Sequence, residues 1–405
     1  QFAAGITDVD VVSTYTARII TANPWPTLPY DISNQPGIEG VILPKNYVDT
    51  EGWEHFGRNP VGTGPWKFVA HETGNFIEYE AFEDYWGGAP EYDQLRMLVV
   101  PELSTRSAML RRDEVDIADI SLDQAGTLKD AGFTVAEDPQ RTSLRVHLYG
   151  TYYGEPGYDG EGYTDPGPTK HLAVRKALNL AINRQEIVDA LFEGRGSPAA
   201  VFPVSSISIG YPADLEPYPY DPEQARQLMQ DAGFASGFDI KLFTFPQGSM
   251  PAYLEVAEAV AGYWDAIGVR AEIVPTDIGA FRPLYNAQPQ PAELTGQAST
   301  FASTGRLNGR DGLPPWWNVS RKLLALSPNM DEYYTRASEA PTVEEIGKAV
   351  QEGYHVVYDN YRSVPIANVS GALWAYGNSL AGVNITILPL RGFIAPWIGR
   401  PSTTN

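Results

Sequence analysis

The clearest pattern of hydrophobic and polar positions lies in residues 58–117. The run GTGP from Gly62 predicts a tight turn, because glycine reaches positive φ without strain and proline fixes φ. Apolar residues then alternate with polar ones in residues 66–70 and 77–81, and the run HETG between them suits a hairpin turn. The stretch is therefore expected to begin as a turn and a hairpin. The apolar spacing predicts that a strand and a helix follow, at residues 95–100 and 103–112.

The same criteria predict three more strands and one helix in the first third of the chain. They lie at residues 10–22, 37–43 and 133–137 and, for the helix, at residues 123–131. Pro24 and Pro26 end the first of these strands, because proline cannot donate to a strand ladder. Gly132 ends the helix, since glycine commonly follows the last helical turn.

Residues 142–149 alternate strictly and predict a strand with two chemically different faces. The apolar face carries Leu144, Val146 and Leu148, and the other face carries Ser143, Arg145, His147 and Tyr149. The next residues, 150–170, are rich in glycine, tyrosine and proline. They are expected to form a surface loop.

Residues 171–194 have the strongest helical pattern in the chain. Asn183, with Glu186 three residues further on, is a variant of the capping box and predicts a second helix that Gly194 ends. Another helix is expected after Asp221, which is a favourable N-cap followed by proline. Strands and helices then alternate. A strand is expected at residues 240–245, a helix at 253–267 and a strand at 269–274, and later a helix at 342–358 and a strand at 363–369.

Regular patterning is lost in residues 281–329. The runs STFASTGR from Ser299 and LNGRDGLPPWW from Leu307 are rich in hydrogen-bonding side chains and aromatic rings. Loops of this length inside a compact lobe are uncommon, and such loops often bind ligands. We therefore expect a long binding loop in this part of the chain.

Composition restricts the function classes. The 405 residues are 43% hydrophobic and 20% charged, which is typical of a chain that builds more than one packed core. The net charge of −21 disfavours binding to nucleic acid or to an anionic membrane. There is no cysteine, so disulfides and thiolate nucleophiles are excluded, and the five histidines show no metal-ligand spacing. The sequence contains no run of 18 apolar residues, which is about the length needed to span a membrane.

Three runs of sequence resemble a known family. They are NPVGTGPW from Asn59, EDYWGGAPEYDQLRM from Glu83 and STRSAMLRRDEVDIADI from Ser104. Together they resemble the signature segment of the family 5 extracellular solute-binding proteins, which are the oligopeptide- and dipeptide-binding components of ABC importers. Two residues depart from the family pattern, Trp66 in place of tyrosine and Asp113 in place of glycine. The segment around Asn183 also resembles the family, with asparagine in place of the usual aspartate.

The resemblance implies an α/β fold, a two-lobed periplasmic-binding-protein-like clamp of type II in the peptide-binding-protein subclass, with mixed sheets and helices in each lobe. The first lobe is expected to comprise residues 1–144 and 368–405, and the second lobe residues 145–367. The chain should cross between lobes in two strands, at residues 142–149 and 364–370, that run side by side. Residues 8–56 resemble the part just before the family's GTGP turn. We therefore expect that the chain lacks the front of the first lobe, together with an export signal and any lipid anchor.

The implied function is capture of a small solute outside the cytoplasmic membrane, periplasmic or anchored at the cell surface, for the permease of an ABC importer. An oligopeptide or dipeptide is the first expectation for the solute, and sugars, opines and metal chelates are alternatives. The protein is expected to be a monomer, to bind no nucleic acid, to need no cofactor or metal and to catalyse no reaction. An extracellular polymer hydrolase is the rival from another class, with Glu78 and Glu80, or Glu83 and Asp84, as paired carboxylates. A sensor or a chaperone of the same fold is a further alternative.

Rings and hydrogen-bond donors beside the expected crossings form the predicted ligand site. Its residues are Tyr149, Tyr152, Phe301, Ser303, Arg306, Asp311, Trp316, Trp317 and Trp374. The resemblance implies that an aspartate of the second lobe pairs with a peptide's amino group, and Asp311 is the nearest candidate. Arg306 and Arg310 could instead hold a carboxylate or a phosphate.

Overall fold

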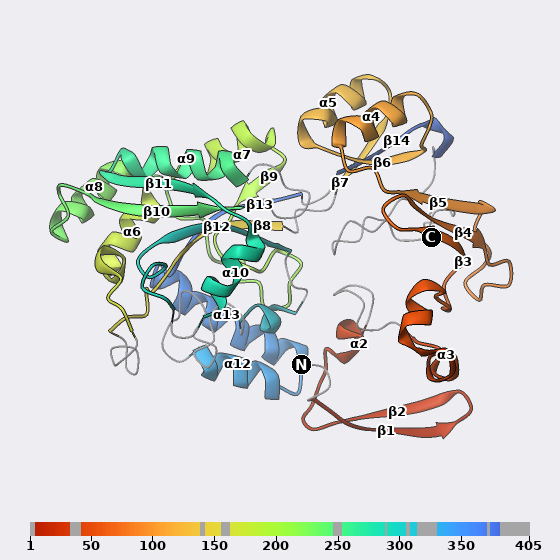
Figure 1. Cartoon of the computed structure of the whole chain (residues 1–405). Coiled ribbons are helices and arrows are strands. Elements are labelled where there is room, and N and C mark those ends of the chain that lie inside the picture. The colour runs from red at the N-terminus through yellow and green to blue at the C-terminus, as the bar shows by residue number, and fades with distance from the viewer. Residues whose placement is uncertain are drawn as a thin grey trace. The chain divides into compact units, whose positions relative to one another are not determined.

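The structure of the chain is a computed structural model that forms two compact units (Figure 1). It describes residues 5–32, 42–137, 142–154, 163–245, 253–287, 290–304, 308–313, 330–370 and 373–380. Unit 1 comprises residues 1–31 and 140–369, and unit 2 comprises residues 32–139 and 370–405. The chain therefore crosses between the units three times, after residues 31, 139 and 369. The two predicted lobes stay a prediction, and residues 1–31 group with unit 1 by their contacts.

A six-stranded mixed sheet forms the centre of unit 1. Its strand order is β11 (Val269–Pro275), β10 (Phe238–Thr244), β12 (Ala298–Thr304), β8 (Thr142–Leu148), β13 (Ser363–Val369) and β9 (Gly196–Pro198). β10 pairs in parallel with both β11 and β12, and the remaining neighbours are antiparallel. β8 and β13 lie side by side, from Thr142 opposite Val369 to His147 opposite Ser363. The prediction that residues 142–149 and 364–370 run side by side is therefore confirmed.

Helices surround this sheet. They are η1 (Gly167–Lys170), α6 (Leu172–Leu180), α7 (Arg184–Phe192), α8 (Pro222–Asp231), α9 (Tyr253–Asp265), α10 (Ile278–Asn286), η2 (Gly309–Gly312), α12 (Met330–Glu339) and α13 (Val343–Asp359). The predicted caps are confirmed, because Asn183 accepts from the Glu186 N–H (3.2 Å) and Asp221 accepts from the Gln224 N–H (2.8 Å). α9 packs along β10 and β11 (Figure 1).

The strand predicted at residues 142–149 is confirmed as β8, and one prediction about a neighbouring strand was wrong. Both faces of β8 are buried, with Ser143, Arg145 and His147 each no more than 1% exposed, because layers cover both faces of this central strand. Residues 299–306 were expected to be loop, yet residues 298–304 form β12. Two of its hydroxyl groups are satisfied inside unit 1, since Ser299 Oγ lies 2.7 Å from the Tyr149 hydroxyl and Thr300 donates to Thr244 (3.0 Å). Polar composition therefore concealed a central strand.

A hairpin begins the described chain, where a single strand at residues 10–22 was predicted. It consists of β1 (Ile6–Ser13) and β2 (Thr16–Thr21). The connection at residues 14–15 contains neither glycine, proline nor asparagine, so the sequence carries no turn signal there. The one-turn helix α2 (Leu28–Asp31) follows. Most of the strand predicted at residues 37–43 lies outside the described residues.

Unit 2 contains two three-stranded sheets. One has the order β3 (Trp66–Glu72), β4 (Phe76–Ala81), β5 (Gln94–Leu98), and the other β6 (Ile117–Ile120), β14 (Leu373–Tyr376), β7 (Thr134–Glu137). Its helices are α3 (Lys45–Arg58), α4 (Leu103–Arg111) and α5 (Leu122–Asp130), and η4 (Asn378–Leu380) follows β14. The predicted hairpin, third strand, two helices and strand at residues 133–137 are confirmed, and Gly132 ends α5 with φ +90°. The sequence analysis did not predict α3.

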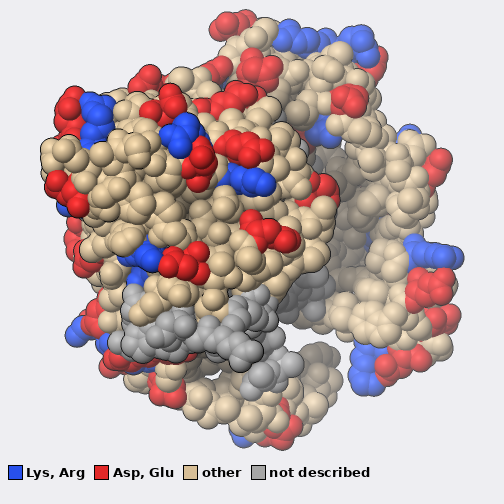
Figure 2. Space-filling model, turned by 60° about the vertical axis from the view of Figure 1, so that its left-hand side comes forward, with Lys and Arg blue, Asp and Glu red and all other residues tan. Residues whose placement is uncertain are grey.

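Charged side chains of both signs are mixed on the face shown in Figure 2, where Lys and Arg side chains lie among Asp and Glu side chains. Exposed ion pairs such as Arg270 with Asp239 (2.6 Å) contribute little stability, because water and salt screen them. Among the described helices, none is long and apolar enough to cross a membrane.

His147 should make the stability of unit 1 depend on pH. Burial and the nearby Arg145 charge hold the pKa of His147 well below its ordinary value of 6.5. Below about pH 6.5 the unfolded chain therefore binds a proton that the folded chain does not, and the free energy of unfolding falls by up to about 1.4 kcal/mol per pH unit. Urea unfolding at pH 7.5 and 5.5 should show a loss about 1 kcal/mol smaller in His147→Gln than in the wild type. His71→Gln, at an exposed position of β3, is the control, and an unchanged pH dependence in His147→Gln would contradict the assignment.

Candidate functional site

The predicted site residues divide among three places. Tyr149, Tyr152, Phe301, Ser303 and Asp311 belong to unit 1, and Trp374 lies on β14 of unit 2. The remaining three, Arg306, Trp316 and Trp317, lie outside the described residues.

The predicted rings of unit 1 are packed inside it. Tyr149 is 0% exposed, and burial raises the pKa of its hydroxyl. It shares a core cluster with Phe301, which is 7% exposed. Tyr152 is also buried, and its hydroxyl donates to Gln290 Oε1 (3.2 Å). These rings support the sheet near the crossings, and direct contact with a ligand stays a prediction for each of them.

A short loop at residues 308–313 presents Asp311. Asn308 forms a parallel bridge with Ile209, and the Gly309 N–H donates to the Ile209 carbonyl (3.1 Å). A Cβ on Gly309 would lie 2.4 Å from that carbonyl oxygen, and a Cβ on Gly312 would lie 2.6 Å from the Tyr354 hydroxyl. Only glycine allows so close an approach at these two positions. The backbone of the loop is therefore fixed against the body of unit 1.

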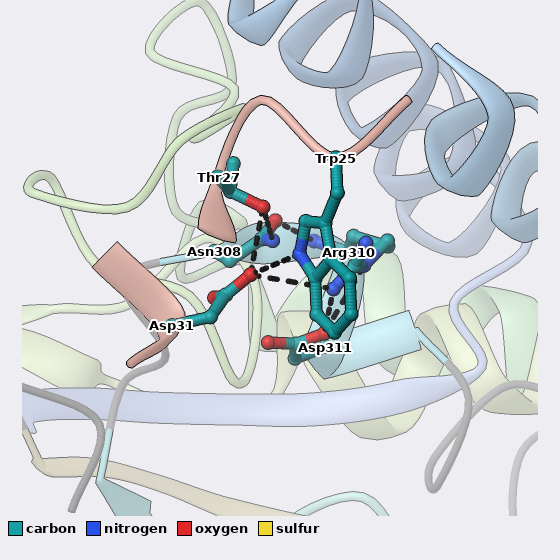
Figure 3. A network of polar contacts seen from close by, with 6 residues as sticks. All are labelled: Trp25, Thr27, Asp31, Asn308, Arg310 and Asp311. Carbon is teal, nitrogen blue, oxygen red and sulfur yellow. Dashed lines mark hydrogen bonds and ion pairs between the residues drawn. The ribbon is translucent and has the colours of Figure 1, made fainter. Parts of the chain in front are cut away.

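Six side chains, three of them from this loop, form a polar network (Figure 3). Its members, which we call the Asp31 network, are Trp25, Thr27, Asp31, Asn308, Arg310 and Asp311. The Asp31 carboxylate accepts from Trp25 Nε1 (2.6 Å) and from the Thr27 hydroxyl (2.8 Å). Thr27 in turn accepts from Asn308 Nδ2 (3.1 Å). Segments nearly 300 positions apart in the sequence therefore meet at one buried carboxylate.

Arg310 lies between two carboxylates. Its Nη2 is 3.8 Å from Asp31 Oδ2 and 3.1 Å from Asp311 Oδ1. The exposed fraction of the side chain rises from 5% for Asp31 through 14% for Arg310 to 43% for Asp311. With both carboxylates ionised, the three groups carry one net negative charge, and Asp311 is the member most open to solvent. Such an arrangement attracts a cationic group more readily than an anionic one.

Only part of this network is visible from the sequence. Asp311 and Arg310 were candidates, but Trp25, Thr27, Asp31 and Asn308 were not. The prolines of the run PWPTLPYD predict only the end of a strand. Its clustered prolines could have suggested an ordered segment, although nothing local indicates its partner.

Trp374 occupies the middle strand of the second sheet of unit 2. Leu373 and Ala375 pack into the core below α4 and α5, so Trp374 lies on the opposite face. Its neighbour across the ladder is Asp119, which forms an ion pair with Arg106 (2.5 Å). In the described part of the chain, the buried indole N–H of Trp374 has no hydrogen-bond partner. Trp374 therefore lies on the face of the sheet opposite to α4 and α5.

None of the described His, Asp and Glu side chains gather into a group of three or more that could hold a metal ion.

Mixed sheets flanked by helices, in two units that the chain enters more than once, place the structure in the α/β class. Residues 1–303 match the family described as "Bacterial extracellular solute-binding proteins, family 5 Middle". The chain belongs to this family, which consists of substrate-binding proteins rather than enzymes.

Individual relatives agree with this assignment. The chain is 29% identical over 322 residues to the heme-binding protein A of Haemophilus influenzae, covering 77% of this chain and 55% of that protein. It is 31% identical over 248 residues to the dipeptide-binding protein of Escherichia coli, covering 59% of this chain and 44% of that protein. The chain therefore spans about half the length of these relatives. Its fold resembles the dipeptide-binding protein of Pseudoalteromonas sp. SM9913 in complex with Met-Leu, with a TM-score of 0.73 and 21% identity over 99% of this chain and 76% of that one.

Proposed function

We propose that the protein captures a solute with a free ammonium group, first of all a dipeptide or oligopeptide, and delivers it to the permease of an ABC importer. The observation that carries the proposal is the charge of the Asp31 network. Arg310 is engaged by two carboxylates, so the residue that faces solvent most is the anionic Asp311. A carboxylate in that position can accept charge-assisted hydrogen bonds from a peptide's amino group.

The charge of the loop also bears on the other solutes. Heme, named for the Haemophilus relative, carries two carboxylates and no ammonium group. The described part of the loop offers such a ligand a guanidinium that is already paired, and this favours the peptide. Sugars, opines and metal chelates remain alternatives for a protein of this family. We expect tyrosine and tryptophan rings, Trp374 among them, to contact the apolar parts of the solute.

Solute capture needs no chemical step. A solute that contacts both units would favour one arrangement of them by its differential affinity, and the permease would recognise that arrangement. The site would work outside the cytoplasmic membrane, where the family acts.

The hydrolase alternative finds less support. Glu78, one of its candidate acids, forms an ion pair with Arg96 (3.2 Å) across the β4–β5 ladder. An opposite-charge pair across a ladder is a common way in which neighbouring strands stabilise a sheet, and it accounts for this carboxylate without catalysis. Incubation with polysaccharides and proteins, followed by an assay for new reducing ends or peptides, should show no cleavage.

Peptide binding should depend on the amino group and on Asp311. In titration calorimetry with the full chain, we expect N-acetylation of a bound dipeptide to weaken binding about 10- to 100-fold, because a hydrogen bond to a charged group contributes about 1.5–3 kcal/mol. Asp311→Asn should cause a loss of similar size for the free-amino peptide and little for the acetylated one. Asp265→Asn, on the exposed side of α9, is the control. Equal affinity of the two peptides, or full affinity in Asp311→Asn, would refute recognition of the amino group.

A further inference from the structure

The residue on which the Asp31 network converges does not lie in the ligand loop. We propose that Asp31 is a positioning residue, which holds the loop at residues 308–313 in place and sets the charge that Asp311 presents to the solute. The effect on solute affinity rests on the function proposed above. The effect on the loop does not, since it is a property of the protein without solute.

Asp31 is a buried carboxylate that is surrounded by hydrogen-bond donors and a guanidinium. The turn of α2 brings it back over Thr27, whose carbonyl accepts from the Asp31 N–H (2.9 Å). Three groups lie nearest to the same carboxylate oxygen, Oδ2: the neutral donors Trp25 Nε1 and Thr27 Oγ1, and the charged Arg310 Nη2. A carboxylate that is only 5% exposed is costly unless such groups stabilise it. The segment is therefore organised around this one oxygen atom.

A directed chain of hydrogen bonds connects Asp31 to the loop. Because Thr27 donates its only hydroxyl proton to Asp31, it can only accept from Asn308, whose Nδ2 lies 3.1 Å away. Asn308 then faces the loop with its Oδ1, which accepts from the Arg310 N–H (3.2 Å) and caps η2. Each bond in this chain orients the next group. The backbone at Arg310 is thereby tied to the Asp31 carboxylate through two buried side chains.

The charge of Asp31 also determines how firmly Arg310 holds Asp311. With Asp31 ionised, Arg310 is shared between two carboxylates, and the network keeps one net negative charge. If Asp31 were neutral, Arg310 and Asp311 would form a balanced pair, and the attraction for a cation would largely disappear. Asp31 therefore acts on the solute through Arg310, without touching it.

The position of Asp31 in the chain gives this link a wider role. Asp31 is the last residue of unit 1 before the first crossing to unit 2. The second and third crossings adjoin β8 and β13, and both strands are fixed by hydrogen bonds to their neighbours in the sheet of unit 1. The first crossing follows only the single turn of α2, and the side chain of Asp31 attaches it to the ligand loop. Occupation of the loop can thus be transmitted to a crossing between the units.

The anchor can be tested without any solute. Thr27→Val preserves shape but removes the hydroxyl between Asp31 and Asn308, so hydrogen exchange in peptides covering residues 308–313 should become at least fivefold faster. Thr295→Val is the matched control, because Thr295 is also a buried threonine of unit 1 whose hydroxyl donates to a carbonyl (Pro291, 3.2 Å). It should leave exchange at residues 308–313 unchanged. Wild-type exchange in Thr27→Val would overturn the anchor.

The charge is tested with the free-amino dipeptide and its N-acetylated form. Asparagine at position 31 keeps an oxygen for Trp25 and Thr27 but removes the charge, so Asp31→Asn should weaken binding of the free-amino peptide about tenfold and that of the acetylated peptide less than twofold. The double variant Asp31→Asn/Arg310→Gln restores one net negative charge, and it should recover at least half of the loss on a logarithmic scale. Asp239→Asn, which breaks a surface pair with Arg270, should have no effect.

The outcomes separate the two proposals. Equal losses for both peptides in Asp31→Asn, or no recovery in the double variant, would overturn the role of the charge. If wild-type protein binds neither peptide, the proposed function fails together with the charge effect, while the exchange experiment still decides the anchor. If Asp31→Asn does not fold, the peptide pair is measured in Thr27→Val, which keeps the charge. In Thr27→Val, the affinity for the free-amino peptide should fall less than tenfold. Complete loss of binding of that peptide would overturn the charge effect.

Discussion

Replacement of Arg184 by methionine is expected to lower the free energy of unfolding by about 3–5 kcal/mol, because several buried carbonyl groups would lose their donor. Arg184 begins α7 and is 3% exposed. Its guanidinium donates to Pro365 O (2.6 Å), Asn179 O (3.0 Å), Tyr218 O (3.3 Å), Ile182 O (3.4 Å) and Asn179 Oδ1 (2.9 Å). Burial without a carboxylate among these partners lowers the pKa of Arg184 to about 10.

The bond to Pro365 explains why the loss should be large. β13 has a register shift between Pro365 and Ala367 opposite β8, so the ladder is irregular there. Arg184 supplies a donor from the adjacent helix at this point. Without it, the strand that leads to the third crossing would hold an unpaired carbonyl inside the sheet.

Urea unfolding monitored by circular dichroism would measure the effect. Arg184→Lys should lose an intermediate amount, since one ammonium group cannot reach carbonyls spread around a planar guanidinium. Arg226→Met on α8 is the matched control, because Arg226 is exposed and pairs with the exposed Glu223. Its expected cost is below about 1 kcal/mol. A similar cost for Arg184→Met and Arg226→Met would contradict a stabilising role of the Arg184 hydrogen bonds.

Local pattern was enough for much of the fold. The hairpin of β3 and β4, the capped helices α7 and α8, and the alternation of β10, α9 and β11 were all predicted. In each case the information lies within a few residues, as a period, a cap or a turn glycine. β12 was missed because Ser299 and Thr300 are satisfied by partners that only the folded protein provides. α10 was missed as well, and it contains Pro283, which argues against a helix when the sequence is considered alone.

The candidate site was less accessible from sequence. Asp311 was found because it stands in an irregular, polar run. Asp31 was not, because its importance arises from Arg310, 279 positions away, and no periodicity reports such a distant pair. Tyr149 and Phe301 were expected to face a ligand since they are rings beside a crossing. Whether a ring beside a crossing is covered depends on the layers that pack on β8, and these come from distant parts of the chain.

Replacement of Trp264 by alanine should cost about 4 kcal/mol, within the range for large aromatic side chains in a core. Trp264 lies on α9, is 0% exposed and is among the largest fully buried side chains of the described chain. Its Nε1 donates to the Leu178 carbonyl (3.0 Å), which lies in the last turn of α6. The Ile182 N–H, which would be the helical partner of that carbonyl, donates to Asn179 instead. Trp264 therefore satisfies one of the carbonyls that a helix end leaves unpaired.

The two contributions of Trp264 can be separated by a graded series. Trp264→Phe keeps most of the buried ring but removes the donor, so it should lose about 1–3 kcal/mol from the unpaired carbonyl and the smaller volume. Leu254→Ala lies on the same helix at a position that is 43% exposed, and its cost should stay below about 1 kcal/mol. Urea unfolding of the three variants gives the comparison. A Trp264→Ala cost no larger than that of Leu254→Ala would contradict this prediction. It would mean that the neighbouring side chains relax to fill the cavity and to pair the Leu178 carbonyl, so that the contact between α9 and α6 does not need this ring.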